Sequence, residues 1–186
     1  MAIRNLKKRL FLKLTLLLAF GALLYGCGFH LRGWNQGLPK FMQKVSIEYQ
    51  GKDFAFLNRL SASITATGAE VVKSAEDADV ILAIKNAASS SSLVGITGGA
   101  SANQYMLSYT VSYQILNRQK QVILKDQINS ASQRYNSNAT QQLSSNAEQQ
   151  QLIGDLQTQV ANNIVLQMQS ISKSEYQPAK KDKASV

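Results

Sequence analysis

Few residues of this chain have side chains and spacing suited to chemistry. Cys27 is the single cysteine and His30 the single histidine among 186 residues, so a metal site of several Cys or His ligands cannot be assembled, and nucleophilic catalysis has one thiol and one imidazole to draw on. The acidic cluster at residues 76–79 lacks the ligand spacing of a calcium loop, and we expect it in a solvated turn. The glycines of segment 95–99 are not followed by the lysine or the helix of a phosphate-binding loop. We therefore predict no catalytic residue, no metal site and no cofactor.

The lone thiol is placed for lipid attachment at the end of an export signal. Residues 1–13 carry five basic side chains and no acid, and residues 14–24 are uncharged and apolar. This is the order of a secretory signal, and the apolar run is shorter than the about 20 residues of a membrane-spanning helix. The sequence Leu24-Tyr25-Gly26-Cys27 resembles a bacterial lipobox, in which cleavage leaves the cysteine to take a diacylglyceryl group. We expect a signal peptide over 1–26, lipidation of Cys27 and a membrane anchor of acyl chains. An uncleaved signal anchor is the alternative.

The basic pI reflects this signal more than the remainder of the chain. The full chain has a net charge of +9, from 20 basic and 11 acidic residues. Without residues 1–26 the balance is 15 basic against 11 acidic, or +4. The remaining basic residues are scattered, whereas a nucleic-acid-binding protein needs a clustered basic face. Nucleic acid is therefore not an expected partner.

Hydrophobic periodicity divides the chain beyond the cysteine into strands and helices. Asp53 is expected to cap the first helix and Gly68 to end it, while Ser145 and Glu148 form a capping box that opens the second. The clearest strand carries aromatic and aliphatic residues at every second position from Tyr105. We predict strands over 45–49, 80–84, 105–116 and 122 to about 135, and helices over 54–67 and from 145 to 171.

These elements predict an α+β fold in one domain over 45–172. The sheet is expected to be small and mostly antiparallel, with about four strands and two helices packed on one face. Residues 27–44 form the lipid-anchored N-terminal linker in this interpretation. Residues 173–186 have no apolar period and several charges, so we expect a disordered C-terminal tail.

Two uncharged polar segments, 87–104 and 136–147, lie beside the predicted hairpin. They are either mobile loops or loops that lie inside a partner, where uncharged chain avoids the desolvation of ions. Lys125 and Arg134, on the returning strand, are the candidate contacts for an anionic ligand, although each basic residue taken singly is typical of a solvated surface.

The seven residues Cys27 to Gly33, CGFHLRG, resemble the mature N-terminus of the lipopolysaccharide-assembly lipoproteins of the LptE family, which typically begins Cys-Gly-aromatic-His-Leu-Arg. The order of elements over 45–171 also fits that family's α/β sandwich. By the sorting rule for such lipoproteins, the residue after the cysteine sets the destination. Gly28 at this position, in place of an aspartate, resembles the signal for the outer membrane.

The resemblance implies an outer-membrane lipoprotein on the periplasmic side. Such a protein lies largely within the β-barrel LptD, plugs it, assists its assembly and helps lipopolysaccharide reach the outer leaflet without making or breaking bonds. Some members place basic residues for lipopolysaccharide phosphates in loops that correspond to 87–104 and 136–147. Neither segment contains Lys or Arg here, so direct lipid binding through them is not expected.

Two other functions remain open from the residues alone. A stand-alone envelope lipoprotein, acting as a lipid carrier or scaffold, would be a stable monomer that binds lipopolysaccharide without a barrel. A hydrolase would depend on His30 and would lose its activity on the substitution His30→Ala.

Overall fold

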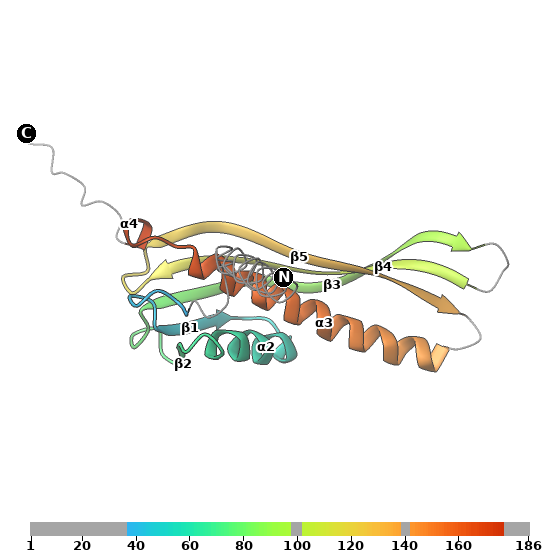
Figure 1. The fold of residues 1–186 in the computed structure, drawn as a ribbon, viewed down its shortest axis with the longest axis horizontal. Coiled ribbons are helices and arrows are strands. Elements are labelled where there is room, and N and C mark those ends of the chain that lie inside the picture. The colour runs from blue at the N-terminus through green and yellow to red at the C-terminus, as the bar shows by residue number, and fades with distance from the viewer. Residues whose placement is uncertain (1–36, 98–101, 139–141, 177–186) are drawn as a thin grey trace, which may run out of the picture. The chain divides into compact units, whose positions relative to one another are not determined.

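The computed structural model describes residues 37–97, 102–138 and 142–176, all within the compact unit Asn35–Val186. Its five-stranded sheet has the order β2-β1-β3-β4-β5, with helices packed against it (Figure 1). The elements are β1 (Lys44–Tyr49), α2 (Phe54–Thr65), β2 (Glu70–Val72), β3 (Val80–Thr97), β4 (Ala102–Asn117), β5 (Val122–Asn138), α3 (Gln142–Gln169) and α4 (Lys173–Tyr176).

The sheet is mixed, which corrects the expected number and direction of its strands. β1 runs parallel to both β2 and β3, while β3, β4 and β5 form an antiparallel series. The three-residue strand β2 was not predicted, because Glu70–Val72 is too short for a periodic pattern. Five strands therefore replace the expected four, and the α+β class is confirmed.

The first helix begins and ends where its capping residues predict. The carboxylate of Asp53 accepts a hydrogen bond from the backbone N–H of Phe56 at 3.0 Å, which satisfies one of the free donors of the first turn. Gly68 has a φ of 85°, a left-handed conformation that favours glycine just beyond a helix. Phe56, Leu60 and Ile64 of α2 are buried against the sheet.

Strands β3, β4 and β5 are longer than predicted and continue beyond β1 and α2, as Figure 1 shows. The expectation of loops over 87–104 and 136–147 was wrong for the described residues: 87–97 belong to β3, 102–104 to β4 and 136–138 to β5. A serine run has little strand propensity of its own. Its extended conformation is imposed by pairing, since Ala87–Thr97 pairs with β4 from Val111 to Ala102, with one irregularity between Leu93 and Gly95.

The long helix α3 begins at Gln142, three residues before the predicted cap at Ser145. Residues 142–147, expected in a loop, therefore lie in the first turns of the helix. The predicted apolar stripe is confirmed, since Leu156, Val160, Ile164 and Met168 are all buried.

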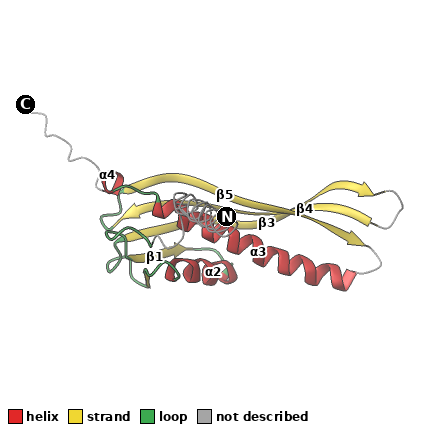
Figure 2. Ribbon diagram, viewed as in Figure 1, coloured by secondary structure: helices red, strands yellow, loops and turns green. Residues whose placement is uncertain are grey.

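Both long helices cover the same face of the sheet, as predicted (Figure 2). The ring of Phe56 in α2 lies 5.5 Å from that of Tyr109 in β4, measured between centroids. The hydroxyl of Tyr113, also in β4, donates a hydrogen bond to the side chain of Gln167 in α3. The core therefore lies between the helices and the odd-numbered residues of β4, which are buried from Leu107 to Ile115.

The short helix α4 lies in the segment that was expected to be disordered. The ring of Tyr176 packs at 4.9 Å from Phe41, and its hydroxyl donates to the backbone oxygen of Asp79 at 2.8 Å. Apolar contact and a satisfied hydroxyl thus order Lys173–Tyr176. The predicted disorder of 177–186, like the signal and linker up to residue 36, lies outside the described residues.

Candidate interaction surface

The distal half of the sheet is the part of β3, β4 and β5 beyond the pairing of β1 with Ile84, and it offers a regular polar surface. Its strand segments are residues 86–97, 102–112 and 128–138. They contain one charged residue, Arg134. A surface so poor in charge can enter a partner without the large cost of desolvating ions.

The helix-covered side of this region is held by aromatic packing. Tyr105 and Tyr135 face each other across β4 and β5, with ring centroids 5.6 Å apart and an angle of 23° between the rings. The hydroxyl of Tyr135 lies 3.5 Å from that of Ser91 on β3. Offset stacking of this kind fixes the spacing of the strands.

The opposite side of the distal half, which we call the open face, is a ladder of hydroxyl groups. Ser108 and Ser132 share a hydrogen bond of 2.8 Å between their Oγ atoms, and Thr110 and Ser130 share one of 2.9 Å. Each hydroxyl retains unused capacity to donate or accept. Beside them lies Ile128, 75% exposed. The open face can therefore form hydrogen bonds along its length and apolar contacts at side chains such as Ile128.

Arg134 and Lys125 occupy different parts of β5. Arg134 lies opposite Met106 on the open face of the distal half, and its side chain is exposed. Lys125 lies near the base of the hairpin and is also exposed. Nine residues of strand separate them, roughly 30 Å at about 3.4 Å per residue. The structure does not bring them into one anion site, and Cys27 lies outside the described residues.

An ion pair marks the boundary between the base and the distal half. The ammonium of Lys85 in β3 contacts the carboxylate of Asp126 in β5 across the intervening strand. The hydrogen bond and the charge of Lys85 lower the pKa of Asp126 below its usual value. Lys85 sits at an irregularity of the β3–β4 pairing, between Ile84 and Asn86. Both charges are exposed, so the pair adds little to stability.

A polar network around Asp53 ties both helices to the central strand. Its Oδ2 accepts hydrogen bonds from the hydroxyl of Tyr109 at 2.7 Å and from the side-chain amide of Gln157 at 2.9 Å. Arg59 of α2 donates in turn to Gln157 of α3 at 3.1 Å. Burial raises the pKa of Tyr109 well above its ordinary value, and the hydrogen bond and charge of Asp53 raise it further.

Sequence reasoning found the capping role of Asp53 but missed the network. The available signal was the tyrosine at a core-facing position of β4, because a buried hydroxyl requires a partner. Among the described residues, every buried side-chain nitrogen or oxygen has a hydrogen-bond partner. The network is thus part of the scaffold that holds the distal sheet.

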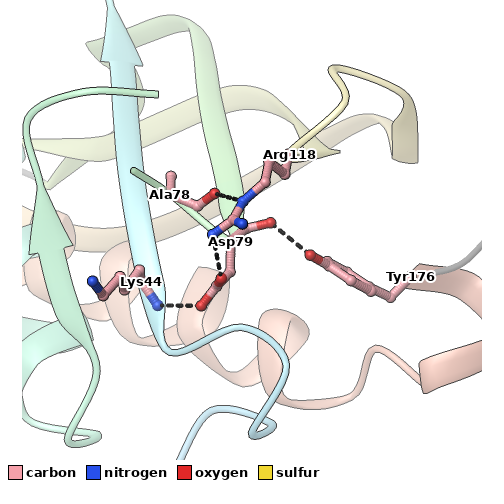
Figure 3. Close-up of polar contacts among 5 residues, drawn as sticks. All are labelled: Lys44, Ala78, Asp79, Arg118 and Tyr176. Atoms are coloured by element: carbon pink, nitrogen blue, oxygen red, sulfur yellow. Dashed lines mark hydrogen bonds and ion pairs between the residues drawn. The ribbon is translucent and has the colours of Figure 1, made fainter. Parts of the chain in front are cut away.

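A second network, drawn in Figure 3, joins the base of the sheet to α4. Asp79 accepts from the backbone N–H of Lys44 at 3.0 Å and from Arg118 at 3.1 Å, and Arg118 also donates to the backbone oxygen of Ala78. Asp79 belongs to the acidic cluster at 76–79, which we expected in a solvated turn. For Asp79 that expectation is wrong, because these hydrogen bonds hold its carboxylate against β1 and Arg118. It connects β1, the β4–β5 turn and, through Tyr176, the C-terminal helix.

The described residues contain neither a helix suited to crossing a membrane nor a cluster of side chains suited to holding a metal ion. None of the described helices combines the length and apolar character that a bilayer-spanning helix needs. Within the same residues, no group of three or more His, Cys, Asp or Glu side chains is arranged to hold a metal ion.

The fold and the open face together define a class of protein: an α/β sandwich with an extended sheet surface, poor in charge, that is suited to contact with another molecule. Residues 42–168, more than half of the chain, match the model of the lipopolysaccharide-assembly family LptE. The chain belongs to this family, which confirms the resemblance carried by CGFHLRG.

Solved structures with the same fold come from several bacteria. A lipoprotein B from Nitrosomonas europaea matches with a TM-score of 0.63 and 23% identity, covering 77% of this chain and 91% of its own. A minor lipoprotein from Acinetobacter baumannii matches with a TM-score of 0.59 and 22% identity, covering 69% of this chain and 92% of its own. Comparison with curated protein sequences gives no significant match.

Proposed function

We propose that this chain is an outer-membrane lipoprotein that plugs the lipopolysaccharide-translocating barrel LptD, assists its assembly and supports passage of lipopolysaccharide to the outer leaflet. The family match over residues 42–168 carries the proposal. The lipobox-like sequence at Cys27 and the similarity of the fold to two bacterial lipoproteins support an envelope lipoprotein.

The distal half of the sheet supports the barrel as a partner. A protein enclosed by another loses the water around its charged groups, at a large cost for each ion that remains unpaired. Here the strands that extend beyond β1 carry hydroxyl and amide groups, with Arg134 as their one charge. We propose that this part lies within the barrel, while the base, with its ion pairs, stays near the periplasmic opening.

Arg134 is the better placed of the two basic candidates for lipopolysaccharide. It is exposed on the open face, and a guanidinium can bind a phosphate group with two parallel hydrogen bonds. Lys125 lies too far away to share that phosphate. We propose Arg134 as the contact with lipopolysaccharide and Lys125 as a separate and weaker one.

Co-purification tests the proposal. A C-terminally tagged chain is extracted from outer membranes with mild detergent, and the material bound to the tag is examined for LptD. We expect LptD in a stable complex with the chain. Recovery of the chain as a monomer that binds lipopolysaccharide without a barrel would favour the stand-alone lipid carrier or scaffold instead.

The anchor is tested separately. Intact mass of the membrane form should show cleavage before Cys27 and addition of acyl chains. The variant Cys27→Ala should carry no lipid. Once its complex with the barrel is dissociated, it should therefore be released from the membrane. Retention of that variant in carbonate-washed membranes that lack LptD would indicate an uncleaved signal anchor.

A further inference from the structure

The outer edge of β3 is free along most of its length in the described part of the chain. β1 pairs with it only from Val80 to Ile84, whereas β4 pairs with its other edge as far as Thr97. From Ala88 to Val94 every residue is exposed. Alternate backbone N–H and C=O groups of this segment therefore point outward, available for a further strand.

This edge lacks the protection that edge strands usually carry. Natural sheets block their edges with lysine, proline, charge or very short strands. The outer strand β5 has Lys125, Asp126 and Arg134, and β2 has three residues. The segment Asn86–Leu93 has no charge and no proline, and irregularities of pairing bound it at both ends.

The chemistry of the segment indicates what would pair with it. Its side chains from Ala87 to Ser92 are alanine and serine only, so a neighbouring strand meets no bulk on either face. Lys85, the nearest cation on β3, already contacts Asp126. An added strand should therefore be uncharged and can bring larger side chains, which would cover the small ones and contact the exposed Leu93 and Val94.

A second copy of this chain fits the same edge less well. Two such segments in antiparallel pairing would place alanine and serine against alanine and serine, which buries little apolar surface. Main-chain hydrogen bonds that merely replace those to water contribute little by themselves. A strand of different composition would add apolar contact to the same hydrogen bonds.

We propose that Asn86–Leu93 of β3 is a strand-addition site, at which an uncharged extended segment of the barrel protein LptD joins the sheet through main-chain hydrogen bonds. This inference rests on the proposed function for the identity of the partner. It goes further in naming the edge and the backbone as the means of recognition.

The test separates backbone from side chain. Consecutive N–H groups of a strand point to opposite edges, so one of Ser90 and Ser91 donates to β4 and the other faces the free edge. Proline is tolerated only at the latter position. The variants Ser90→Pro and Ser91→Pro are compared with Ser90→Ala and Ser91→Ala in membranes that contain LptD. The proline variant that keeps the wild-type melting temperature should lose about tenfold in co-purified LptD, while both alanine variants keep it.

If neither proline variant folds, a charge variant tests the same edge. Ser90→Lys adds a cation to an exposed position of the free edge, and Asn136→Lys adds one to an exposed position of β5 as the matched control. Both substitutions place a charge in the distal half, so Asn136→Lys measures the cost of that charge away from the free edge. Ser90→Lys should reduce co-purified LptD about tenfold more than Asn136→Lys does.

Three results would overturn the inference. If a folded Ser90→Lys or proline variant co-purifies with wild-type levels of LptD, the proposed function stands but the β3 edge is not the site of contact. A homodimer that Ser90→Lys dissociates, with LptD binding intact, would assign the edge to a second copy. Absence of LptD from the wild-type preparation would instead refute the proposed function, and the assigned partner with it.

Discussion

The hydroxyl of Tyr109, in the central strand β4, donates a hydrogen bond of 2.7 Å to Oδ2 of Asp53, the residue that caps helix α2. One carboxylate thus caps the N-terminus of a helix and accepts the hydrogen bond of a buried tyrosine hydroxyl. Because Gln157 of α3 donates to the same oxygen, the contact fixes two helices on the sheet. It anchors both helices to the part of β4 that belongs to the distal half of the sheet.

Removal of this carboxylate should destabilise the whole sandwich. Asp53→Ala loses the helix cap, at about 1 kcal/mol, and leaves the buried hydroxyl of Tyr109 without its acceptor, at about 1–3 kcal/mol. We expect the free energy of unfolding, measured by urea denaturation, to fall by about 2–4 kcal/mol. Asp77→Ala, in an exposed turn, is the control and should change it by less than about 0.5 kcal/mol. Equal effects of the two variants would contradict the role of the network.

Alkaline pH should weaken the fold through its tyrosines. Burial raises the folded-state pKa of Tyr109 and Tyr113 above the ordinary value of 10.0. As the pH rises through about 10, the unfolded chain therefore loses phenolic protons before the folded chain does. The free energy of unfolding should be constant below this pH with respect to these groups and should decrease above it. Denaturation between pH 8 and 11 measures the slope, which Tyr109→Phe should make shallower. An unchanged slope in that variant would show that Tyr109 is not responsible.

The C-terminal helix should contribute modestly to stability. Tyr176→Ala removes the ring contact with Phe41 and the hydrogen bond to the backbone oxygen of Asp79. We expect a loss of about 1–3 kcal/mol, measured by thermal unfolding. Lys173→Ala, an exposed position in the same helix, is the matched control. A loss no greater than that of the control would mean that α4 is not held by Tyr176.

Arg134 and Lys125 should act independently if both contact lipopolysaccharide. Loss of one charged hydrogen bond costs about 1.5–3 kcal/mol, or roughly 10–150-fold in affinity. We expect Arg134→Ala to weaken binding within this range and Lys125→Ala to weaken it less, as measured by adding purified lipopolysaccharide to the complex of each variant with LptD. Because the two residues lie far apart, the double variant should show the sum of the two free-energy changes. A strongly non-additive result would indicate a shared site.

Local patterns predicted most elements of the base of the sandwich. β1 and α2 with its cap appear where apolar spacing and Asp53 place them, and the core face of β4 follows from alternation beginning at Tyr105. Each of these signals arises within a few residues of chain. The serine-rich part of β3 has no such signal, because its side chains neither alternate in polarity nor favour a strand.

The sequence by itself determined that a single thiol follows an apolar run with the order typical of an export signal, that chemically reactive side chains are scarce and that the fold is of the α+β class. It also carried the family resemblance, through seven residues after the signal. The tertiary structure decided that the uncharged segments belong to β3, β4, β5 and the start of α3, that Arg134 and Lys125 lie apart and that one edge of β3 has no partner strand among the described residues. The physical reason is that these features depend on pairing between distant segments. Ala87–Thr97 is extended because β4 lies beside it, and no described strand covers its outer edge because β1 ends at Tyr49.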